Sequence, residues 1–189
     1  HIRNSISNLV LYNAETGGST SRPENINGNW NADGGFNFNT AIDSAAHWNL
    51  GSDTRLRYNN FVGYVAQAKS DAQENTTRTT NVSQRLNMSY RNDWLELTLD
   101  GYVNYQHSRN ELQPTADLDT WQFNYGGQML LRLPLGIELS SNLRQHSRRG
   151  YNDPSSNTNE LIWNGQVSKS FLKSKTLIVA LNFYDLLGQ

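Results

Sequence analysis

Hydrophobic and polar residues alternate along this chain with a period of two, most clearly on either side of residue 92. In both segments alternate positions are apolar, and the positions between them are polar. The apolar positions are Val82, Leu86, Met88 and Tyr90 in the first segment, and Leu95, Leu97, Leu99 and Val103 in the second. Successive side chains of a β-strand point to opposite faces, so this pattern predicts a sheet with one apolar face and one polar face.

Two environments favour a sheet of this kind. In water, the apolar face packs against a protein core and the polar face is solvated. In an outer membrane, the apolar face of a β-barrel contacts lipid, while the polar face lines a wet interior. The expected function depends on which of these two environments the apolar face meets.

The alternation and the turn-forming residues together predict about nine strands. They cover residues 4–12, 27–38, 48–66, 78–91, 94–108, 120–133, 136–149, 159–171 and 176–184. Most of these segments are longer than the roughly five or six residues of a typical globular strand. Several exceed the roughly 9 to 11 residues with which a tilted strand crosses a bilayer. Strand length therefore favours the wall of a barrel.

The connections between the expected strands alternate between short and long. Short turns are expected at Asn92-Asp93, around Pro134 and at 172–174, and long polar loops at 67–77, 109–119 and 150–158. Residues 14–24 are expected to form another long loop, and residues 39–46 a longer turn on the short side. Outer-membrane barrels have short turns on the periplasmic side and longer loops outside. The alternation therefore favours the same fold.

Turn length fixes which residues face each other in two hairpins. A two-residue turn at Asn92-Asp93 predicts the apolar pairs Met88–Leu97 and Leu86–Leu99, and the polar pairs Arg85–Asp100 and Asn87–Thr98. A three-residue turn around Pro134 predicts the pairs Leu133–Ile137, Leu131–Leu139 and Arg132–Glu138. Both registers bring apolar residues together and place opposite charges across from each other, as cross-strand energetics favour.

These registers assign side chains to the two faces of the expected wall. The residues expected to face the lumen are Arg85, Asp100, Arg132, Glu138, Arg144, His146 and Arg148. The residues expected to face lipid are Leu86, Met88, Leu97, Leu99, Leu131 and Leu139. The aromatic residues expected at the membrane interfaces are Tyr90, Trp94, Tyr105, Trp121 and Tyr125. Amphipathic rings near both ends of the strands are typical of the aromatic girdles of membrane barrels.

Three of the lumen candidates, Arg144, His146 and Arg148, form a basic ladder near a long loop. One interpretation is that the ladder attracts anionic solutes or gives a channel selectivity. The other is that these residues are paired across strands with carboxylates and amides, and we favour this second interpretation. The pairs Arg85–Asp100 and Arg132–Glu138 are likewise interpreted as structural.

Composition narrows the classes of function. The chain has 189 residues, a net charge of −1 and a pI near 6.5, which give no electrostatic reason to expect a nucleic-acid partner. It contains no cysteine, which excludes disulfides, thiolate zinc sites and thiol catalysis. The four histidines are scattered at positions 1, 47, 107 and 146, and the common nucleotide-binding and hydrolase motifs are absent. We therefore expect no enzymatic activity, no metal site and no cofactor.

Hydropathy does not decide between the two environments. The mean hydropathy of −0.70 is in the range of water-soluble proteins. It does not argue against a barrel, because half of each membrane strand faces water. No stretch of the sequence reaches the roughly 18 to 20 apolar residues of a membrane helix.

Several short motifs resemble those of a known family. They are Asn27-Gly28-Asn29-Trp30, Asn60-Phe61-Val62-Gly63-Tyr64, Leu133-Pro134-Leu135, Arg149-Gly150-Tyr151, Ser168-Lys169-Ser170-Phe171-Leu172-Lys173 and Tyr184-Asp185-Leu186-Leu187-Gly188-Gln189. In this order they are similar to recurrent pieces of the Bacteroidota outer-membrane β-barrel proteins, a family related to TonB-dependent receptors. The resemblance spans essentially the whole chain, and its specificity lies in the order of the pieces.

The resemblance implies the C-terminal portion of a larger barrel in a bacterial outer membrane, in contact with outer-membrane lipid. Members of the family carry an N-terminal regulatory-like β domain, a plug domain, many more strands and a few closing strands. Related receptors import nutrients with energy coupled from the inner membrane. The resemblance therefore implies an energy-coupling protein and a surface lipoprotein as partners, reached through parts of the protein outside these residues.

We therefore expect residues 1–189 to form a single partial domain, an incomplete antiparallel transmembrane β-barrel of about nine strands, without plug, regulatory domain or closing strands. The leading functional hypothesis is TonB-dependent receptor-like uptake of a nutrient across the outer membrane. One alternative is a non-transporting barrel that serves as an interaction or assembly scaffold in an outer-membrane complex. The other is a soluble all-β binding domain, such as a sandwich or a lectin-like module.

Overall fold

The computed structural model of the protein describes residues 3–66, 70–171 and 176–188. Its strands are β1 (Ser5–Tyr12), β2 (Ser19–Ile26), β3 (Trp30–Ala41), β4 (Trp48–Val65), β5 (Gln73–Arg91), β6 (Leu95–Asn110), β7 (Leu118–Leu133), β8 (Ile137–Arg149), β9 (Asn159–Phe171) and β10 (Leu177–Phe183). The short 3-10 segments are η1 (Pro114–Ala116), η2 (Pro134–Gly136) and η3 (Pro154–Ser156). No α-helix occurs in the described ranges, so the all-β prediction is confirmed.

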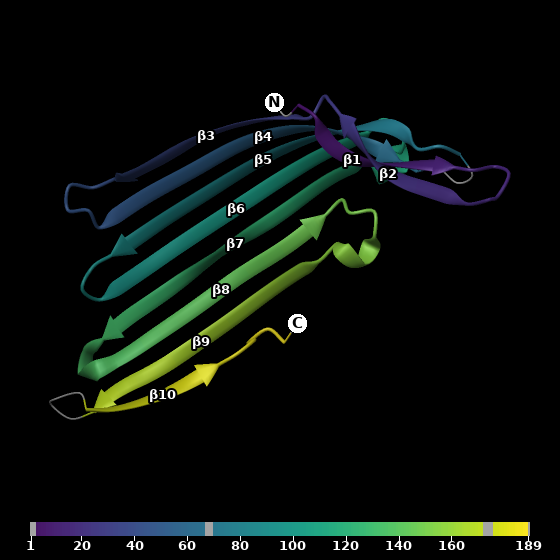
Figure 1. The fold of residues 1–189 in the computed structure, drawn as a ribbon. Coiled ribbons are helices and arrows are strands. Elements are labelled where there is room, and N and C mark those ends of the chain that lie inside the picture. Colours follow the sequence, from purple (N-terminus) through teal and green to yellow (C-terminus); the bar gives the residue numbers. More distant parts are fainter. Residues whose placement is uncertain (1–2, 67–69, 172–175, 189) are drawn as a thin grey trace. The chain divides into compact units, whose positions relative to one another are not determined.

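Strands β3 to β10 form one eight-stranded sheet, in which every strand lies beside its neighbours in the sequence (Figure 1). Strands β1 and β2 form a separate two-stranded ribbon. The pairs β7–β8, β8–β9 and β9–β10 are antiparallel, as the short turns require. Strands β3 and β10 are the two edges of the large sheet, which is therefore open. The large antiparallel sheet is therefore confirmed, while its closure into a barrel stays a prediction.

Several strands are as long as the alternation predicts. Strands β4 and β5 have 18 and 19 residues, β6 and β7 have 16 each, and β8 and β9 have 13 each. The predicted bounds of β4, β6, β7, β8 and β9 differ from the observed ones by at most two residues at either end. The turn predicted at 172–174 lies outside the described residues.

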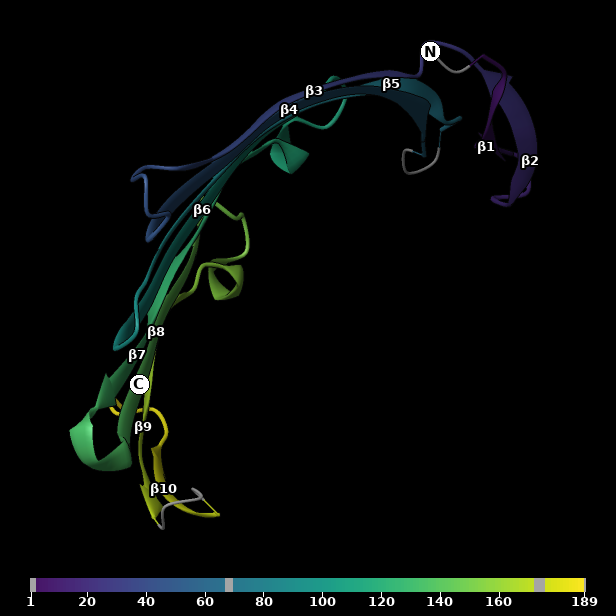
Figure 2. The ribbon, with the colours of Figure 1, turned by 90° about the vertical axis from the view of Figure 1, so that its left-hand side faces the viewer.

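The contacts of the chain divide it into two compact units, and each is described by itself below. The smaller unit consists of His1–Gly34, Leu56–Val82 and Gln106–Asp119. The larger unit consists of Gly35–Arg55, Ser83–Tyr105 and Thr120–Gln189. All the residues predicted to face the lumen, the lipid or the membrane interfaces belong to the larger unit. Figure 2 shows the strands of the larger unit edge-on, as a single layer.

The loop predicted at residues 14–24 is wrong, because most of this segment is strand β2. Asn13 turns the chain: its side chain accepts hydrogen bonds from the backbone N–H groups of Glu15 and Thr16, and its own N–H donates to the carbonyl of Gly18. Gly17 has φ +69°, a left-handed conformation that glycine adopts without strain. Strand β2 is missed by the alternation because it is polar on both sides and almost entirely exposed.

Strand β5 begins at Gln73, five residues before the predicted start, so the loop predicted at 67–77 is too long. Polar cross-strand contacts extend the pairing into this region. Thr77 Oγ1 donates to Asn110 Oδ1 at 2.7 Å, and the hydroxyls of Thr79 and Ser108 lie 3.0 Å apart. A ladder of Thr, Ser and Asn side chains stabilises strands without an apolar alternation, which explains why the sequence pattern misses it.

The hairpin between β7 and β8 has the predicted register. Leu131 lies opposite Leu139, and Arg132 lies opposite Glu138. The turn is η2, where Leu135 and Gly136 both have positive φ, at +65° and +72°. A three-residue turn of this kind fixes the parity of both strands, so the two faces are those that the sequence predicts.

The hairpin between β5 and β6 differs from its predicted register by two residues. Asn92 N–H donates to the carbonyl of Leu95 at 2.9 Å, so the two turn residues are Asp93 and Trp94 rather than Asn92 and Asp93. The Asn92 side chain explains the shift, because its Oδ1 accepts hydrogen bonds from the N–H groups of Trp94 and Leu95. A shift by two keeps every side chain on its predicted face and changes only its partner.

The turn between β3 and β4 is organised by Asp43. Strand β3 continues to Ala41, so the turn is shorter than the predicted span of residues 39–46. The Asp43 carboxylate accepts hydrogen bonds from the N–H groups of Trp48, at 2.7 Å, and His47, at 3.2 Å. The hydrogen bond from Trp48 is the main reason why the pKa of Asp43 lies below its usual value.

The buried hydrophobic side chains in the described part of the chain are Ile26 and Val62, both in the smaller unit. Asn29 is buried beside them: its Oδ1 accepts a hydrogen bond from the N–H of Val62 at 2.7 Å, and its amide donates to the carbonyl of the same residue. This single side chain therefore joins the start of β3 to the end of β4 and satisfies a buried backbone group.

Asn29→Ala is expected to lower the free energy of local opening at Val62 by about 1 to 3 kcal/mol, because it leaves a buried N–H without an acceptor. The measurement is native-state hydrogen exchange of the Val62 amide. Asn31→Ala is the matched control, since Asn31 is exposed on the same strand. Equal protection of Val62 in the two variants would show that Asn29 does not hold this segment.

Candidate functional site

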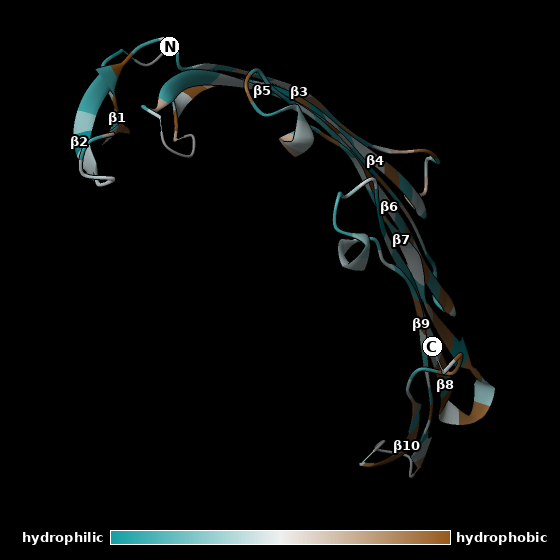
Figure 3. Cartoon of the chain, turned by 90° about the vertical axis from the view of Figure 1, so that its right-hand side faces the viewer, coloured by the Kyte–Doolittle hydropathy of each residue, from teal (hydrophilic) through white to brown (hydrophobic). Residues whose placement is uncertain are grey.

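One face of the larger unit is apolar. Leu131, Leu139, Val167 and Leu181 lie opposite one another in a row across β7, β8, β9 and β10. Val167 is 39% exposed and Leu181 is 62% exposed. Figure 3 shows hydrophobic and hydrophilic residues alternating along these strands. The row is a continuous strip of branched aliphatic side chains.

The predicted lipid-facing residues lie on this apolar face. By strand parity and register, the face includes Leu86, Met88, Leu97, Leu99, Leu131 and Leu139. Leu86 is 51% exposed and Leu99 is 40% exposed, and no apolar side chain of the larger unit is buried within the described ranges. Their common face is therefore observed, while their contact with lipid stays a prediction.

Two groups of polar side chains on the apolar face are hydrogen-bonded to neighbours on the same face. The Gln84 amide donates to Ser52 Oγ at 2.9 Å and accepts a hydrogen bond from Thr54 Oγ1. Trp163 Nε1 donates to Ser141 Oγ at 2.9 Å. Polar groups that meet hydrocarbon must be satisfied internally, because an unpaired group there is costly. These side-chain pairs meet that requirement, whereas the buried Ser147 hydroxyl on the same face has no hydrogen-bond partner among the described residues.

The predicted interface aromatics form two clusters along the strands. Near the short turns, Tyr90 packs against Trp48 with ring centroids 4.6 Å apart, and Trp94 is 54% exposed at the turn. Toward the long loops, Tyr105 packs against Trp121 at 4.5 Å. The fifth predicted aromatic, Tyr125, is 57% exposed on the same strand as Trp121. An apolar band flanked by rings on both sides is typical of a membrane barrel.

The opposite face is polar, and its turn end carries an ion network around Glu96. Arg132 Nη2 lies 2.6 Å from Glu96 Oε1, and Arg91 Nη2 lies 3.2 Å from Glu96 Oε2. Arg132 is also 4.0 Å from Glu138, its predicted partner. The pairing of Arg132 with Glu138 is thus confirmed by the register, but the shorter contact is with Glu96, which the sequence analysis did not single out.

The predicted pair Arg85–Asp100 is wrong, because the β5–β6 register places Arg85 opposite Tyr102. The guanidinium of Arg85 lies over the Tyr102 ring, 5.5 Å from its centroid. Asp100 lies diagonally from Arg85, and the two line the same hollow on the polar face. The error has one cause, the two-residue shift made by the Asn92 turn.

The predicted basic ladder is present along β8, and its members have different surroundings. His146 Nδ1 contacts Asn124 Oδ1 on one side and lies opposite Glu160 on the other. The Arg148 guanidinium lies over the Tyr151 ring, 4.5 Å from its centroid. Arg144 lies opposite Gly126 and Ile162, and within the described residues it makes no ion pair. The interpretation of residues paired across strands with carboxylates and amides therefore describes His146, whereas Arg148 stacks on a tyrosine of the following loop and Arg144 has no such partner within the described residues.

The loop after β8 folds back onto the polar face. Tyr151 is the contact, since Gln122 Nε2 donates to its hydroxyl at 2.8 Å. Partial burial raises the pKa of Tyr151, but the hydrogen bonds from Arg148 and Gln122 outweigh it, so this pKa lies below its usual value. At η3, the Ser155 hydroxyl and N–H donate to Asp153 and lower the pKa of its carboxyl.

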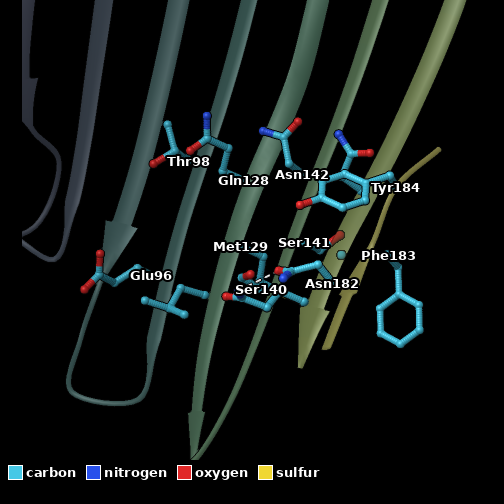
Figure 4. Close-up of a pocket in the computed structure, with 14 residues that line it drawn as sticks. Glu96, Thr98, Gln128, Met129, Ser140, Ser141, Asn142, Asn182, Phe183 and Tyr184 are labelled. Atoms are coloured by element: carbon cyan, nitrogen blue, oxygen red, sulfur yellow. Dashed lines mark hydrogen bonds between the residues drawn. The ribbon is translucent and has the colours of Figure 1, made fainter. Parts of the chain in front are cut away.

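A groove of about 480 Å³ crosses the polar face from β6 to the segment after β10 (Figure 4). Its side chains include a neutral row that the sequence analysis did not select, and the row consists of Thr98, Gln128, Asn142, Asn164 and Tyr184. Gln128 lies opposite Asn142, and Asn142 lies opposite Asn164. Only the register brings these residues together, because they are scattered over almost ninety positions of the sequence.

The described residues hold no cluster of three or more His, Asp or Glu side chains that could bind a metal ion. No helix among them is both long enough and apolar enough to span a membrane. Comparison of the chain with protein-family models, with curated proteins and with solved structures finds no significant match.

Proposed function

We propose that this chain forms part of the wall of a transmembrane β-barrel in a bacterial outer membrane, in a protein that takes up a polar nutrient. The observation that carries the proposal is the single-layered sheet with one apolar and one polar face. In the proposed barrel, the apolar face contacts lipid and the polar face lines the interior.

The exposed apolar side chains of the larger unit support a lipid-facing sheet. Within the described ranges, none of the apolar side chains of this unit is buried. Large apolar surfaces that stay open to solvent are rare in soluble monomers and mark a site of contact with a membrane or a protein. The open apolar face therefore favours the barrel over a soluble sandwich, whose apolar faces would be packed.

The stagger of the turns supports a tilted, barrel-like arrangement of the strands. The carbonyl of Trp94, in the β5–β6 turn, accepts a hydrogen bond from the N–H of Arg132 on β7. Strand β7 continues beyond Arg132 to its own turn at η2. Ile137, just past η2, lies opposite Lys169, but β9 continues to Phe171 before it turns. Each turn therefore lies beyond the level of the preceding turn, by a little over one residue for each strand crossed. With a rise of about 3.3 Å per residue and a strand spacing of about 4.8 Å, this offset corresponds to a strand tilt of about 40°, within the range of membrane barrels.

Uptake is proposed from the resemblance to the outer-membrane barrel family related to TonB-dependent receptors, and from the polar interior face. Energy coupling and a surface lipoprotein partner belong to this proposal, and they would act through other parts of the complete protein. A scaffold without transport would need the same lipid-facing wall but no open polar groove, so the groove of the polar face favours uptake.

The test is fractionation of a cell that produces the complete protein, followed by electrophoresis with and without boiling. We expect the protein in the outer-membrane fraction, resistant to carbonate washing, with a faster band before boiling than after it. Folded barrels resist detergent at room temperature because all their backbone hydrogen bonds are internal. Recovery of the protein from the soluble fraction without detergent would reject the membrane wall.

A further inference from the structure

We propose that the groove on the polar face binds a neutral carbohydrate, with Gln128, Asn142 and Asn164 as hydrogen-bonding residues and Tyr184 as the stacking residue. This inference rests on the proposed function, because it names the class of nutrient that the barrel would take up.

The groove carries no uncompensated charge. The single charged residue that lines it is Glu96, and two arginines neutralise this carboxylate, at 2.6 Å from Arg132 and 3.2 Å from Arg91. The remaining polar side chains are amides and hydroxyls. An anionic or cationic ligand would find no counter-charge here, so the groove favours a neutral one.

The amides of the groove have hydrogen-bond donors and acceptors that the protein does not use. Within the described residues, Thr98, Gln128 and Asn142 make no side-chain hydrogen bond to the protein. Asn164 uses one lone pair to accept a hydrogen bond from the N–H of Asp185 at 2.9 Å, and its NH₂ group remains available. An amide offers both donors and acceptors, which is the combination that a sugar hydroxyl, itself donor and acceptor, requires.

The side chains of the row are evenly spaced across the strands. Thr98, Gln128, Asn142 and Asn164 lie on four adjacent strands, in register, so neighbouring groups are separated by the strand spacing of about 4.8 Å. This repeat is close to the length of one pyranose unit. A short oligosaccharide that lies across the strands would therefore present successive hydroxyl groups to successive side chains.

An aromatic ring lies at the end of the row. Tyr184 follows β10 and is 78% exposed, and Figure 4 shows its ring among the side chains that line the groove. The apolar face of a pyranose stacks on such a ring and leaves its hydroxyls free for the amides. The groove volume of about 480 Å³ is within the usual range of small-molecule sites, about 300 to 1,000 Å³.

The experiment is a titration of the complete protein, purified in detergent, with neutral disaccharides, followed by saturation-transfer NMR. The probes are maltose, cellobiose, lactose and sucrose, with sucrose octasulfate as the anionic counterpart. We expect at least one neutral sugar to bind and the anionic one to bind more weakly. Absence of binding by all four neutral sugars at millimolar concentration, or stronger binding of the octasulfate, would overturn the proposal.

Variants locate the binding. Asn142→Ala should weaken the neutral sugar by about fivefold to tenfold, since it removes one or two hydrogen bonds. Tyr184→Ala should weaken it similarly, while Tyr184→Phe, which keeps the ring, should retain most of the affinity. Asn104→Ala is the matched control, because Asn104 lies on the polar face outside the groove. An equal loss in the control would place the sugar elsewhere and overturn the assignment.

Two further measurements separate the possible failures. A single cysteine at Asn142→Cys should react with a hydrophilic maleimide and should be protected by the bound sugar, and lack of reaction would mean that another part of the protein covers the groove. Boiling-dependent electrophoresis of the same preparation reports on the barrel. A folded barrel that binds no sugar rejects the groove and leaves the proposed wall intact.

Discussion

Leu99→Arg is expected to lower the free energy of unfolding of the complete protein in lipid vesicles by roughly 2 to 4 kcal/mol and to reduce insertion. Leu99 lies on the apolar face of β6, midway in the sequence between Trp94, in the turn before this strand, and Tyr105, within it. Its side chain is 40% exposed, so the arginine would meet the surrounding medium rather than a packed core. The cost arises because hydrocarbon cannot solvate the guanidinium.

The matched control is Thr98→Arg, one residue earlier at nearly the same depth. Thr98 points to the polar face, so its replacement should change the unfolding free energy by less than about 1 kcal/mol. The measurement is urea-induced unfolding monitored by tryptophan fluorescence. A similar loss in both variants would mean that the two faces do not meet different solvents, and a negligible loss in both would place the apolar face outside lipid.

Gly126→Ala is expected to destabilise the sheet by about 1 to 3 kcal/mol, as overpacking does elsewhere. A Cβ atom at this position would overlap the carbonyl oxygen of Leu143 and lie 3.2 Å from Cα of Arg144, both in the backbone of β8. A side chain could rotate away from such a contact, but a paired backbone cannot. The strands would have to separate, with loss of hydrogen bonds.

Gly101→Ala is the matched control for Gly126→Ala, and its effect on the unfolding free energy should differ in sign. No atom lies within 4 Å of a Cβ placed at Gly101, which is in the middle of β6. Alanine there should be neutral or stabilising by about 0.5 to 1 kcal/mol, because glycine in a strand loses more backbone entropy on folding. Both variants are measured by the same unfolding titration. Destabilisation by both, or by neither, would contradict the close approach of β7 and β8 at Gly126.

The two faces of the sheet could be predicted from the sequence because side-chain parity survives errors of register. The β7–β8 register was predicted from the turn around Pro134 and is confirmed. The β5–β6 register was wrong by two residues, since Asn92 accepts two backbone hydrogen bonds and moves the turn forward. The shift left Leu97 and Leu99 on the predicted face but exchanged the partner of Arg85.

The candidate binding row could not be predicted in the same way. Gln128, Asn142 and Asn164 are neutral residues at ordinary strand positions, and nothing in their local sequence distinguishes them from other polar wall residues. Their significance depends on three registers being known together, and on the neutralisation of Glu96 by Arg132 from another hairpin. Charge distinguishes the basic ladder in the sequence instead, but His146 and Arg148 in that ladder already contact other side chains.

The meander order of the sheet has a consequence for how the protein folds. Every strand from β3 to β10 pairs with its neighbours in the sequence, so each pairing can begin at the turn or loop that joins the two strands. Closing such a connection costs little chain entropy, although the far ends of the long strands are distant in sequence. The sheet can therefore grow one hairpin at a time from any tight turn.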